Sequence, residues 1–264
     1  MRALFPPVAN AETTVQAAYS DILGRAADTH SLLGRPHVVL NMVSSTDGAI
    51  ALDGLSGGLS GSADKEVFFY LRSIADVILV GASTAREENY GQPKLSDELR
   101  AQRASRGQPP LPRIAVVTRS MRIDWSSRLY GDPGSPAGLP LVLCPANTPP
   151  GLRGPAAGIA ELLPAGEDDV DFPAALGQLG ERGVSLVLCE GGPTLNGQLL
   201  SAGLVDEVCL TISPVLVGGR GPRISGWNDP QPALGLQLVS TCESEGVLML
   251  RYATKSVSNS ASQD

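Results

Sequence analysis

The chain has 264 residues, 42% of them hydrophobic, and its 20 basic and 27 acidic side chains give a net charge of −7 at pH 7. The length suits one large domain or two small ones, and the acidic balance argues against a nucleic-acid-binding function, which rests on basic surface. The sequence holds no run of about 18 apolar residues that could span a membrane, and residues 1–11 lack the apolar core of a secretory signal. We therefore expect a cytoplasmic protein whose four widely spaced cysteines are reduced and buried.

The first 34 residues (1–34) form an N-terminal extension ahead of the main domain. Within it, Thr13 or Thr14 can cap a short helix. The main domain begins with an apolar strand over 37–43, which ends in the turn-forming residues 44–48. A loop rich in glycine and serine follows.

Helices and strands then alternate along the chain. The apolar spacing of residues 62–74 predicts a helix capped by Ser62, and continuous apolar runs predict strands that are buried on both faces. Asp171 caps a further helix, and Pro193 and Gly203 mark the first turn and the end of another. The predicted helices cover 62–74, 96–106, 171–183 and 193–203, and the predicted strands cover 77–81, 113–118, 141–144, 158–163 and 184–190.

The C-terminal part of the sequence has a different pattern. Residues 207–212, 234–241 and 247–252 are typical of strands with no helix between them, so we expect them to pair antiparallel. We therefore expect an α/β fold of three layers, with a mostly parallel central sheet and antiparallel C-terminal strands. One domain spans residues 35–253, and we expect the polar tail 254–264 to be disordered.

In open α/β sheets, ligands bind at the carboxyl ends of the strands. One predicted strand ends at Glu190 and is followed by Gly191, Gly192, Pro193 and Thr194. A diglycine lets another group approach the backbone closely, and the start of a helix presents free N–H groups that suit a phosphate. An ordinary strand-to-helix turn has the same pattern. No G-x-G-x-x-G follows a strand, so a standard Rossmann site is not expected.

Other strand ends carry weaker signals. Thr118 and Arg119 follow a buried strand, where an arginine can bind a phosphate such as the 2′-phosphate of NADPH, although a solvated turn has the same residues. Asp47, Glu88 and Glu190 are the acidic candidates for proton transfer or for hydrogen bonds to a heterocycle. With two histidines and no metal-binding motif, a metal centre is not expected.

Four segments of the sequence, in the right order and at suitable spacing, match one known family as an ensemble. They read NMVSSTDG at 41–48, ADVILVGAST at 75–84, EGGPTL at 190–195 and GLVDEVCLTISPVLVGG at 203–219. Over about residues 35–252, the chain resembles the riboflavin-biosynthesis pyrimidine reductases, the C-terminal half of the bifunctional deaminase-reductase.

The resemblance implies a dihydrofolate-reductase-like fold, NADPH as hydride donor and a homodimer. It implies reduction of the ribosyl side chain of 5-amino-6-(5-phosphoribosylamino)uracil, by a reductase without a deaminase domain. The substrate would contact Ser56, Glu190 and Arg72, with Arg72 as the cation for its phosphate. Asp47 and Asn41 join Glu190 as candidate catalytic residues. By position, the implied cofactor contacts are Val43, Gly58, Thr84, Glu88, Gly191, Gly192, Pro193, Thr194 and Leu195. To these we add Thr118 and Arg119 as the residues expected to bind the 2′-phosphate.

Two positions and one segment depart from the family pattern. Asn41 stands where many bacterial relatives carry lysine, and Glu88 replaces a common aspartate. Residues 89–94 do not match the arginine-bearing loop that binds the substrate phosphate in other members. Two alternatives therefore stay open. One is reduction of another heterocycle such as dihydrofolate, which needs no phosphate contact, and the other is dinucleotide binding without turnover.

Overall fold

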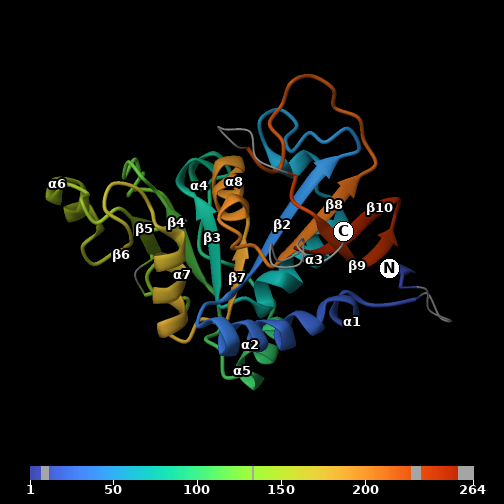
Figure 1. Cartoon of the computed structure of the whole chain (residues 1–264), viewed down its shortest axis with the longest axis horizontal. Coiled ribbons are helices and arrows are strands. Elements are labelled where there is room, and N and C mark those ends of the chain that lie inside the picture. The colour runs from blue at the N-terminus through green and yellow to red at the C-terminus, as the bar shows by residue number, and fades with distance from the viewer. Residues whose placement is uncertain (7–11, 133, 227–232, 255–264) are drawn as a thin grey trace, which may run out of the picture.

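The computed structural model describes residues 1–6, 12–132, 134–226 and 233–254. Its strands are β1 (Arg2–Phe5), β2 (His37–Ser45), β3 (Val77–Gly81), β4 (Arg113–Val117), β5 (Leu141–Cys144), β6 (Glu161–Pro164), β7 (Leu186–Cys189), β8 (Glu207–Ser213), β9 (Leu236–Ser244) and β10 (Val247–Thr254). Within these residues they form one mixed sheet in the order β1-β9-β10-β8-β2-β7-β3-β4-β5-β6 (Figure 1). The strands from β8 to β6 in this order run parallel, and β10, β9 and β1 continue the sheet antiparallel. The expected α/β fold with antiparallel C-terminal strands is confirmed.

Chain connectivity explains where the parallel pairing stops. A crossover helix leads from β7 to β8, so β8 can lie parallel beside β2. β9 and β10 are joined by two residues, Glu245 and Gly246, with φ values of 56° and 79°. Positive φ at both positions is the geometry of a type I′ hairpin turn, which forces antiparallel pairing.

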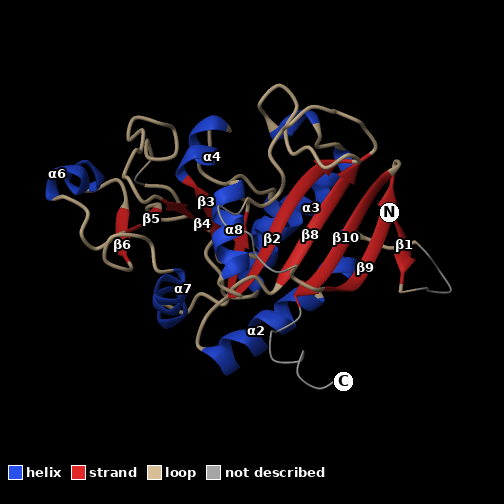
Figure 2. Ribbon diagram, turned by 45° about the horizontal axis from the view of Figure 1, so that its top comes forward, coloured by secondary structure: helices blue, strands red, loops and turns tan. Residues whose placement is uncertain are grey.

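The helices are α1 (Val15–Tyr19), α2 (Asp21–Leu33), α3 (Ser62–Ile74), α4 (Ala82–Glu87), α5 (Asp97–Ser105), α6 (Pro150–Arg153), α7 (Phe172–Glu181) and α8 (Pro193–Ser201), with short 3₁₀ turns at Ser56–Gly58 and Gly154–Ala156. α1, α2 and α3 bury apolar side chains against one face of the sheet, and α7 and α8 do so against the other. Figure 2 shows α7 and α8 in front of the sheet and α3 behind it. Successive strand residues such as Ile78 and Leu79 point into opposite cores, which is why these strands are apolar throughout. All four cysteines are free and buried.

Side-chain caps fix the starts of several predicted helices. The side chains of Thr14, Ser96 and Asp171 accept a hydrogen bond from a backbone N–H in the first turn of α1, α5 and α7. For α3 the expected cap is displaced by one residue. Gly61 is the N-cap, and the Ser62 hydroxyl instead donates to the Glu245 carboxylate.

The N-terminal extension packs as part of the domain. β1 pairs with β9 at the edge of the sheet, and the helical segment continues to Leu33, beyond the short helix that the sequence predicted. Buried Arg251 on β10 donates to Asp21 on α2 at 2.8 Å and to Glu207 on β8 at 2.9 Å. These contacts join α2 to two strands of the antiparallel half. The tail was expected to begin at Thr254, but Thr254 is the last residue of β10 and pairs with β9, and residues 255–264 lie outside the described residues.

None of the helices within the described ranges has the length and apolar character needed to cross a membrane.

Candidate active site

A cleft of about 690 Å³ opens at the carboxyl-terminal side of β2 and β7. Its walls come from these strands, the loop before α3, one side of α3 and the segments 88–94 and 128–132. Its volume falls within the range of small-molecule sites, about 300–1000 Å³. Of the residues that the sequence predicted, it brings together Asn41, Val43, Ser56, Arg72, Glu88 and Glu190.

Three side chains form a hydrogen-bonded network in the cleft wall. Arg72 in the last turn of α3 donates through Nε to Glu190 Oε1 and through Nη2 to Glu190 Oε2, each at 2.7 Å. The hydroxyl of Tyr90 donates to Glu190 Oε2, also at 2.7 Å. The Arg72 guanidinium also lies 4.1 Å from the centroid of the Phe68 ring, one turn earlier on α3. The network fixes the Glu190 carboxylate at the end of β7.

Burial and charge set the protonation states of this network. The side chains of Arg72 and Glu190 are 13% and 2% exposed. Although burial alone would lower it, the charge of Glu190 raises the pKa of Arg72. Burial, followed by the charge of Glu190, raises the pKa of Tyr90 well above its usual value. Arg72 is therefore cationic and Tyr90 a neutral donor at physiological pH.

The Gly- and Ser-rich loop is fastened to the end of α4. The backbone N–H of Ser56 donates to Glu88 Oε1 at 2.8 Å, and both residues line the cleft. Gly58, two residues on, packs against Leu52, and a Cβ there would lie 3.0 Å from the Leu52 Cδ2. The Glu88 carboxylate therefore positions the loop that faces α3.

The diglycine turn between β7 and α8 lies directly against the turn between β3 and α4. Gly191 and Gly192 have φ values of 97° and 80°. The backbone N–H of Gly81 donates to the Gly191 carbonyl at 3.0 Å, and a Cβ on Gly192 would lie 2.9 Å from Thr84 Oγ1. A side chain at Gly192 would have to displace the Thr84 hydroxyl, and both glycines have backbone angles that residues with a side chain rarely adopt.

The start of α8 suits an anionic group. Gly192 is its N-cap and offers no capping side chain, Pro193 occupies the first position, and Thr194 is exposed. The free N–H groups of this turn and the Thr194 hydroxyl are donors for a phosphate. The side chain of Leu195 is buried in the core and holds the helix in place. These residues fit the phosphate groups of a nicotinamide cofactor.

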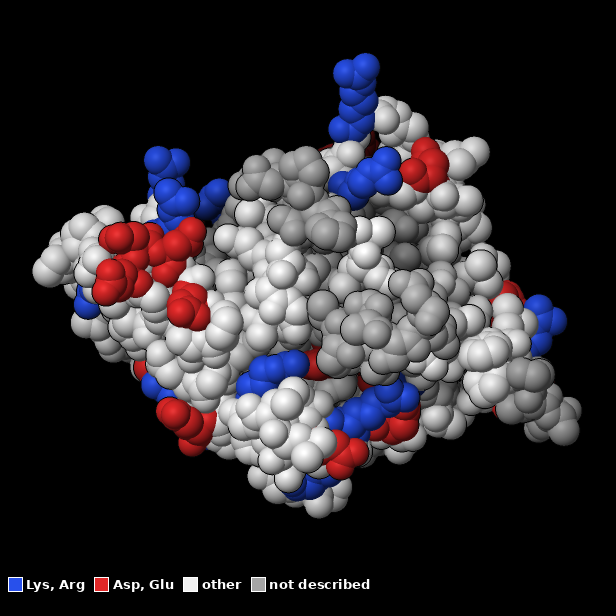
Figure 3. Space-filling view, in the orientation of Figure 1, with Lys and Arg blue, Asp and Glu red and all other residues white. Residues whose placement is uncertain are grey.

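Thr118 and Arg119 do not line the cleft, but they follow β4, two strands from β7 in the sheet. Thr118 is buried, whereas Arg119 is exposed and forms a long ion pair with Asp169 at 3.7 Å. In Figure 3, acidic side chains gather near the end of the molecule that carries α6 and β6, with basic side chains beside them. Arg119 is therefore accessible for a ligand at this edge of the sheet.

Asp47 also lies outside the cleft lining. The Ser45 hydroxyl donates to its carboxylate, and the backbone N–H of Gly218 donates at 2.6 Å. The hydrogen bond from Ser45, followed by those from Gly218 and Val217, lowers the pKa of Asp47 to about 2. Asp47 is thus held ionised in a turn that joins the end of β2 to the loop after β8.

The cleft contains residues that the sequence analysis did not single out. Tyr90 and Lys94 both lie in the segment 89–94, which the sequence analysis describes only as a departure from the family pattern. Phe68 and Phe69 precede Arg72 at helical spacing on α3, a pattern that could have placed them in the same wall. Arg128 comes from a segment after β4, and no sequence pattern connects it to the site. The additional lining residues include Asp64, Lys65, Phe68, Phe69, Tyr90, Gln92, Lys94, Arg128 and Asp132.

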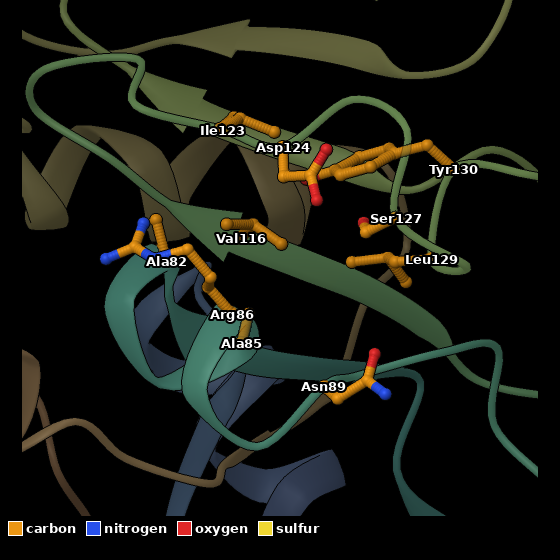
Figure 4. Close-up of a pocket in the computed structure, with 10 residues that line it drawn as sticks. All are labelled: Ala82, Ala85, Arg86, Asn89, Val116, Ile123, Asp124, Ser127, Leu129 and Tyr130. Carbon is orange, nitrogen blue, oxygen red and sulfur yellow. The ribbon is translucent and has the colours of Figure 1, made fainter.

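A second, much smaller pocket of about 70 Å³ lies between α4, β4 and the segment 123–130 (Figure 4). Its labelled side chains include Arg86 and Asn89 on one side and Asp124 and Ser127 on the other. The volume suits a few water molecules and is far below that of a nucleotide. The larger cleft is therefore the candidate active site.

Comparisons with known proteins agree with this geometry. The family model described as the RibD C-terminal domain matches residues 36–250. The 2,5-diamino-6-ribosylamino-4(3H)-pyrimidinone 5′-phosphate reductase of Methanothermobacter thermautotrophicus is 32% identical over 227 residues, 84% of this chain and 99% of that protein. The riboflavin biosynthesis protein RibD of Mycobacterium tuberculosis H37Rv is 29% identical over 187 residues, 70% of this chain and 44% of that protein.

Solved structures give the same grouping. A pyrimidine reductase-like protein from Corynebacterium diphtheriae superposes with a TM-score of 0.79 and 28% identity, covering 93% of this chain and 100% of the other. The relatives named as reductases set aside the alternative of dinucleotide binding without turnover. Because the family model spans most of the sequence and a full-length relative is 32% identical, the chain belongs to the RibD C-terminal domain family and is a reductase of that family.

Proposed function

We propose that the chain catalyses the NADPH-dependent reduction of the ribosylamino side chain of a phosphorylated aminopyrimidine to a ribitylamino side chain. One observation carries this proposal. Glu190 lies in the cleft, and the diglycine turn at the start of α8 follows it directly. A substrate in the cleft and a cofactor whose phosphate is bound at that turn would therefore lie next to each other at the end of β7. When bound, the nicotinamide supplies the hydride, and the chain supplies position and electrostatics.

The pyrimidine ring has two candidate forms. The sequence predicted a 5-aminouracil, whereas the Methanothermobacter relative is named for a 2,5-diaminopyrimidinone. These rings differ at C2, which carries oxygen in the first and an amino group in the second, and they share the ribosyl 5′-phosphate side chain. The proposal covers reduction of that shared side chain.

The Arg72–Glu190–Tyr90 network would act as a fixed polar wall for the substrate. A carboxylate oxygen can accept two hydrogen bonds, so Glu190 Oε1 keeps capacity beyond its bond from Arg72 Nε. A donor on the pyrimidine ring or on the ribose could use it. The Tyr90 hydroxyl donates a hydrogen bond to Glu190. Its pKa is raised well above the usual value, so it does not release its proton near neutral pH.

The preference for NADPH over NADH rests on Thr118 and Arg119. Arg119 is paired with Asp169 in solvent, where such a pair contributes about 0–1 kcal/mol, so a 2′-phosphate can displace it at little cost. We also propose the homodimer that the family resemblance implies, which light scattering in solution would test.

Absorbance at 340 nm tests the proposed reaction. Purified protein would be given NADPH, or NADH as a control, together with the aminouracil phosphate, the diaminopyrimidinone phosphate or dihydrofolate. We expect turnover of at least one pyrimidine phosphate, faster with NADPH than with NADH. Turnover of dihydrofolate alone would assign the scaffold to the other heterocycle and would refute the proposal.

A further inference from the structure

Four basic side chains line the cleft, and they differ in whether their charge is already balanced. Arg72 is tied to Glu190 by two hydrogen bonds at 2.7 Å, and its side chain is 13% exposed. Lys65, Lys94 and Arg128 also line the cleft, are exposed, and have no carboxylate within ion-pair distance among the described residues. A phosphate dianion gains most from cations that have no anionic partner. The family resemblance assigned Arg72 to the substrate phosphate, but the charge of Arg72 is already balanced by Glu190.

Two of the unpaired cations lie on the same wall. Arg128 Nε donates to the Asn89 carbonyl at 2.8 Å, so its side chain lies across the segment that leads to Lys94. Gly91 makes room for this arrangement, because a Cβ there would lie 2.9 Å from Arg128 Nε. Lys65 instead comes from α3, two helical turns before Arg72.

The segment that carries Arg128 is held in place by side-chain contacts to its neighbours. Arg86 Nη1 donates to the Arg122 carbonyl at 3.3 Å, and Gln92 Nε2 donates to the Leu129 carbonyl at 3.0 Å. Figure 4 shows Arg86 on α4 and Leu129 on this segment at the rim of the small pocket. With the bond from Arg128 itself, three contacts set the segment against α4 and the residues that follow it.

We propose that Lys94 and Arg128 bind the 5′-phosphate of the substrate, so that the segment after β4 supplies the arginine that the 89–94 loop lacks. This inference rests on the proposed function. An arginine offers a planar pair of donors to phosphate oxygens, and a lysine adds a flexible point charge. Arg72 then contributes by positioning Glu190, and this contribution is the same whether or not the substrate carries a phosphate.

Kinetics with and without the phosphate separates these roles. Wild type, Lys94→Ala, Arg128→Ala and the double variant would be assayed with the phosphorylated substrate and with the same compound after phosphatase treatment. We expect each single variant to raise KM for the phosphorylated substrate about 10- to 100-fold, the loss typical of a charge-assisted hydrogen bond. The kcat/KM for the dephosphorylated substrate should stay within about twofold, because the substituted side chains face the phosphate alone. Equal losses on both substrates, or no loss on either, would overturn the inference.

Three further variants control for other causes. Arg122→Ala removes an exposed positive charge from the same segment outside the cleft and should leave both substrates unaffected. Gly91→Ala should displace the Arg128 side chain and raise KM for the phosphorylated substrate a few-fold, so that Arg128 is tested without being removed. Arg72→Met should lower activity on both substrates alike. If Arg72→Met lost activity only on the phosphorylated substrate, Arg72 would be the residue that binds the phosphate.

Calorimetric titration with ribose 5-phosphate keeps this test separate from the test of the proposed function. Wild type should bind ribose 5-phosphate and not ribose, and the Lys94→Ala, Arg128→Ala double variant should lose that binding. This result would support the phosphate site even if the protein reduced neither pyrimidine. In that case only the proposed function would be refuted. Equal binding by both proteins, or absence of binding by wild type, would refute the phosphate site.

Discussion

Glu190 shows how the surroundings of one residue decide its chemistry. As a strand-end carboxylate it was a candidate acid, but it accepts two hydrogen bonds from Arg72 and one from Tyr90. These bonds fix the position of both carboxylate oxygens at the end of β7. We therefore expect Glu190 to act as a positioned hydrogen-bond acceptor in the cleft.

Replacing Tyr90 by phenylalanine tests the network at this scale. The variant keeps the ring but removes the donor to Glu190, so we expect the free energy of unfolding to fall by about 1–3 kcal/mol, the range for a hydrogen bond to a charged group. Urea denaturation would measure it. Tyr130→Phe is the matched control, because Tyr130 is also buried and its hydroxyl has no hydrogen-bond partner among the described residues. Equal stability of Tyr90→Phe and wild type would show that the Tyr90 bond contributes nothing.

Among the elements, the turn between β7 and α8 has the strictest backbone requirement. It combines positive φ at two consecutive residues with close contact to the turn that starts α4. The pattern of a strand, two glycines and a proline predicted the turn from the sequence. The pattern did not predict that this turn packs against Thr84, because Thr84 lies more than a hundred residues earlier in the chain.

Gly192→Ala should damage both stability and cofactor binding. A Cβ at Gly192 combines strain at φ 80° with a contact of 2.9 Å to Thr84 Oγ1, and we expect a loss of about 1–3 kcal/mol in unfolding free energy. NADPH affinity, measured by quenching of protein fluorescence, should fall about tenfold as the turn shifts. Gly203→Ala is the control. It has φ 65° but open space around the new Cβ, so it should lose stability and keep NADPH affinity. Unchanged affinity in Gly192→Ala would remove this turn from the cofactor site.

At the scale of the whole molecule, the two halves of the sheet are stabilised differently. The parallel half lies between two layers of helices, whereas the antiparallel half depends on the N-terminal residues that add β1 and place α2 beside Arg251. Arg251 and Glu207 have side chains that are 2% and 1% exposed. Removing one charge of such a buried pair would leave the other uncompensated.

This arrangement predicts a loss of stability in acid. Burial alone would raise the pKa of Glu207, but the His37 ring nitrogen 3.4 Å away and the charge and hydrogen bond of Arg251 lower it. Because the folded pKa lies below the unfolded one, the unfolded chain binds the extra proton. The stabilisation is complete above about pH 5 and is lost as the pH falls through the folded pKa. Urea unfolding between pH 3 and pH 7 would measure this slope. Glu207→Gln should flatten it, and the exposed Glu66→Gln should not. Identical slopes for wild type and Glu207→Gln would contradict the argument.

The sequence predicted local structure well because local structure depends on local patterns. The apolar runs placed the strands of the parallel half, and Asp171 and Pro193 marked helix starts to within a residue. It missed β1, whose four residues have three exposed or half-exposed apolar side chains and become a strand only by pairing with β9. In the cleft, the same limit left out Arg128, since its position depends on three side-chain contacts to distant backbone carbonyls.

The burial of every cysteine has a practical consequence for labelling. Burial raises the pKa of both Cys189 and Cys209 to about 12, so at pH 7 these thiols are almost entirely protonated. Maleimides react with the thiolate and need access to it, and Cys144 and Cys242 are buried as well. A single cysteine introduced at an exposed position such as Arg122 would therefore take up a fluorophore selectively, with the native thiols left in place.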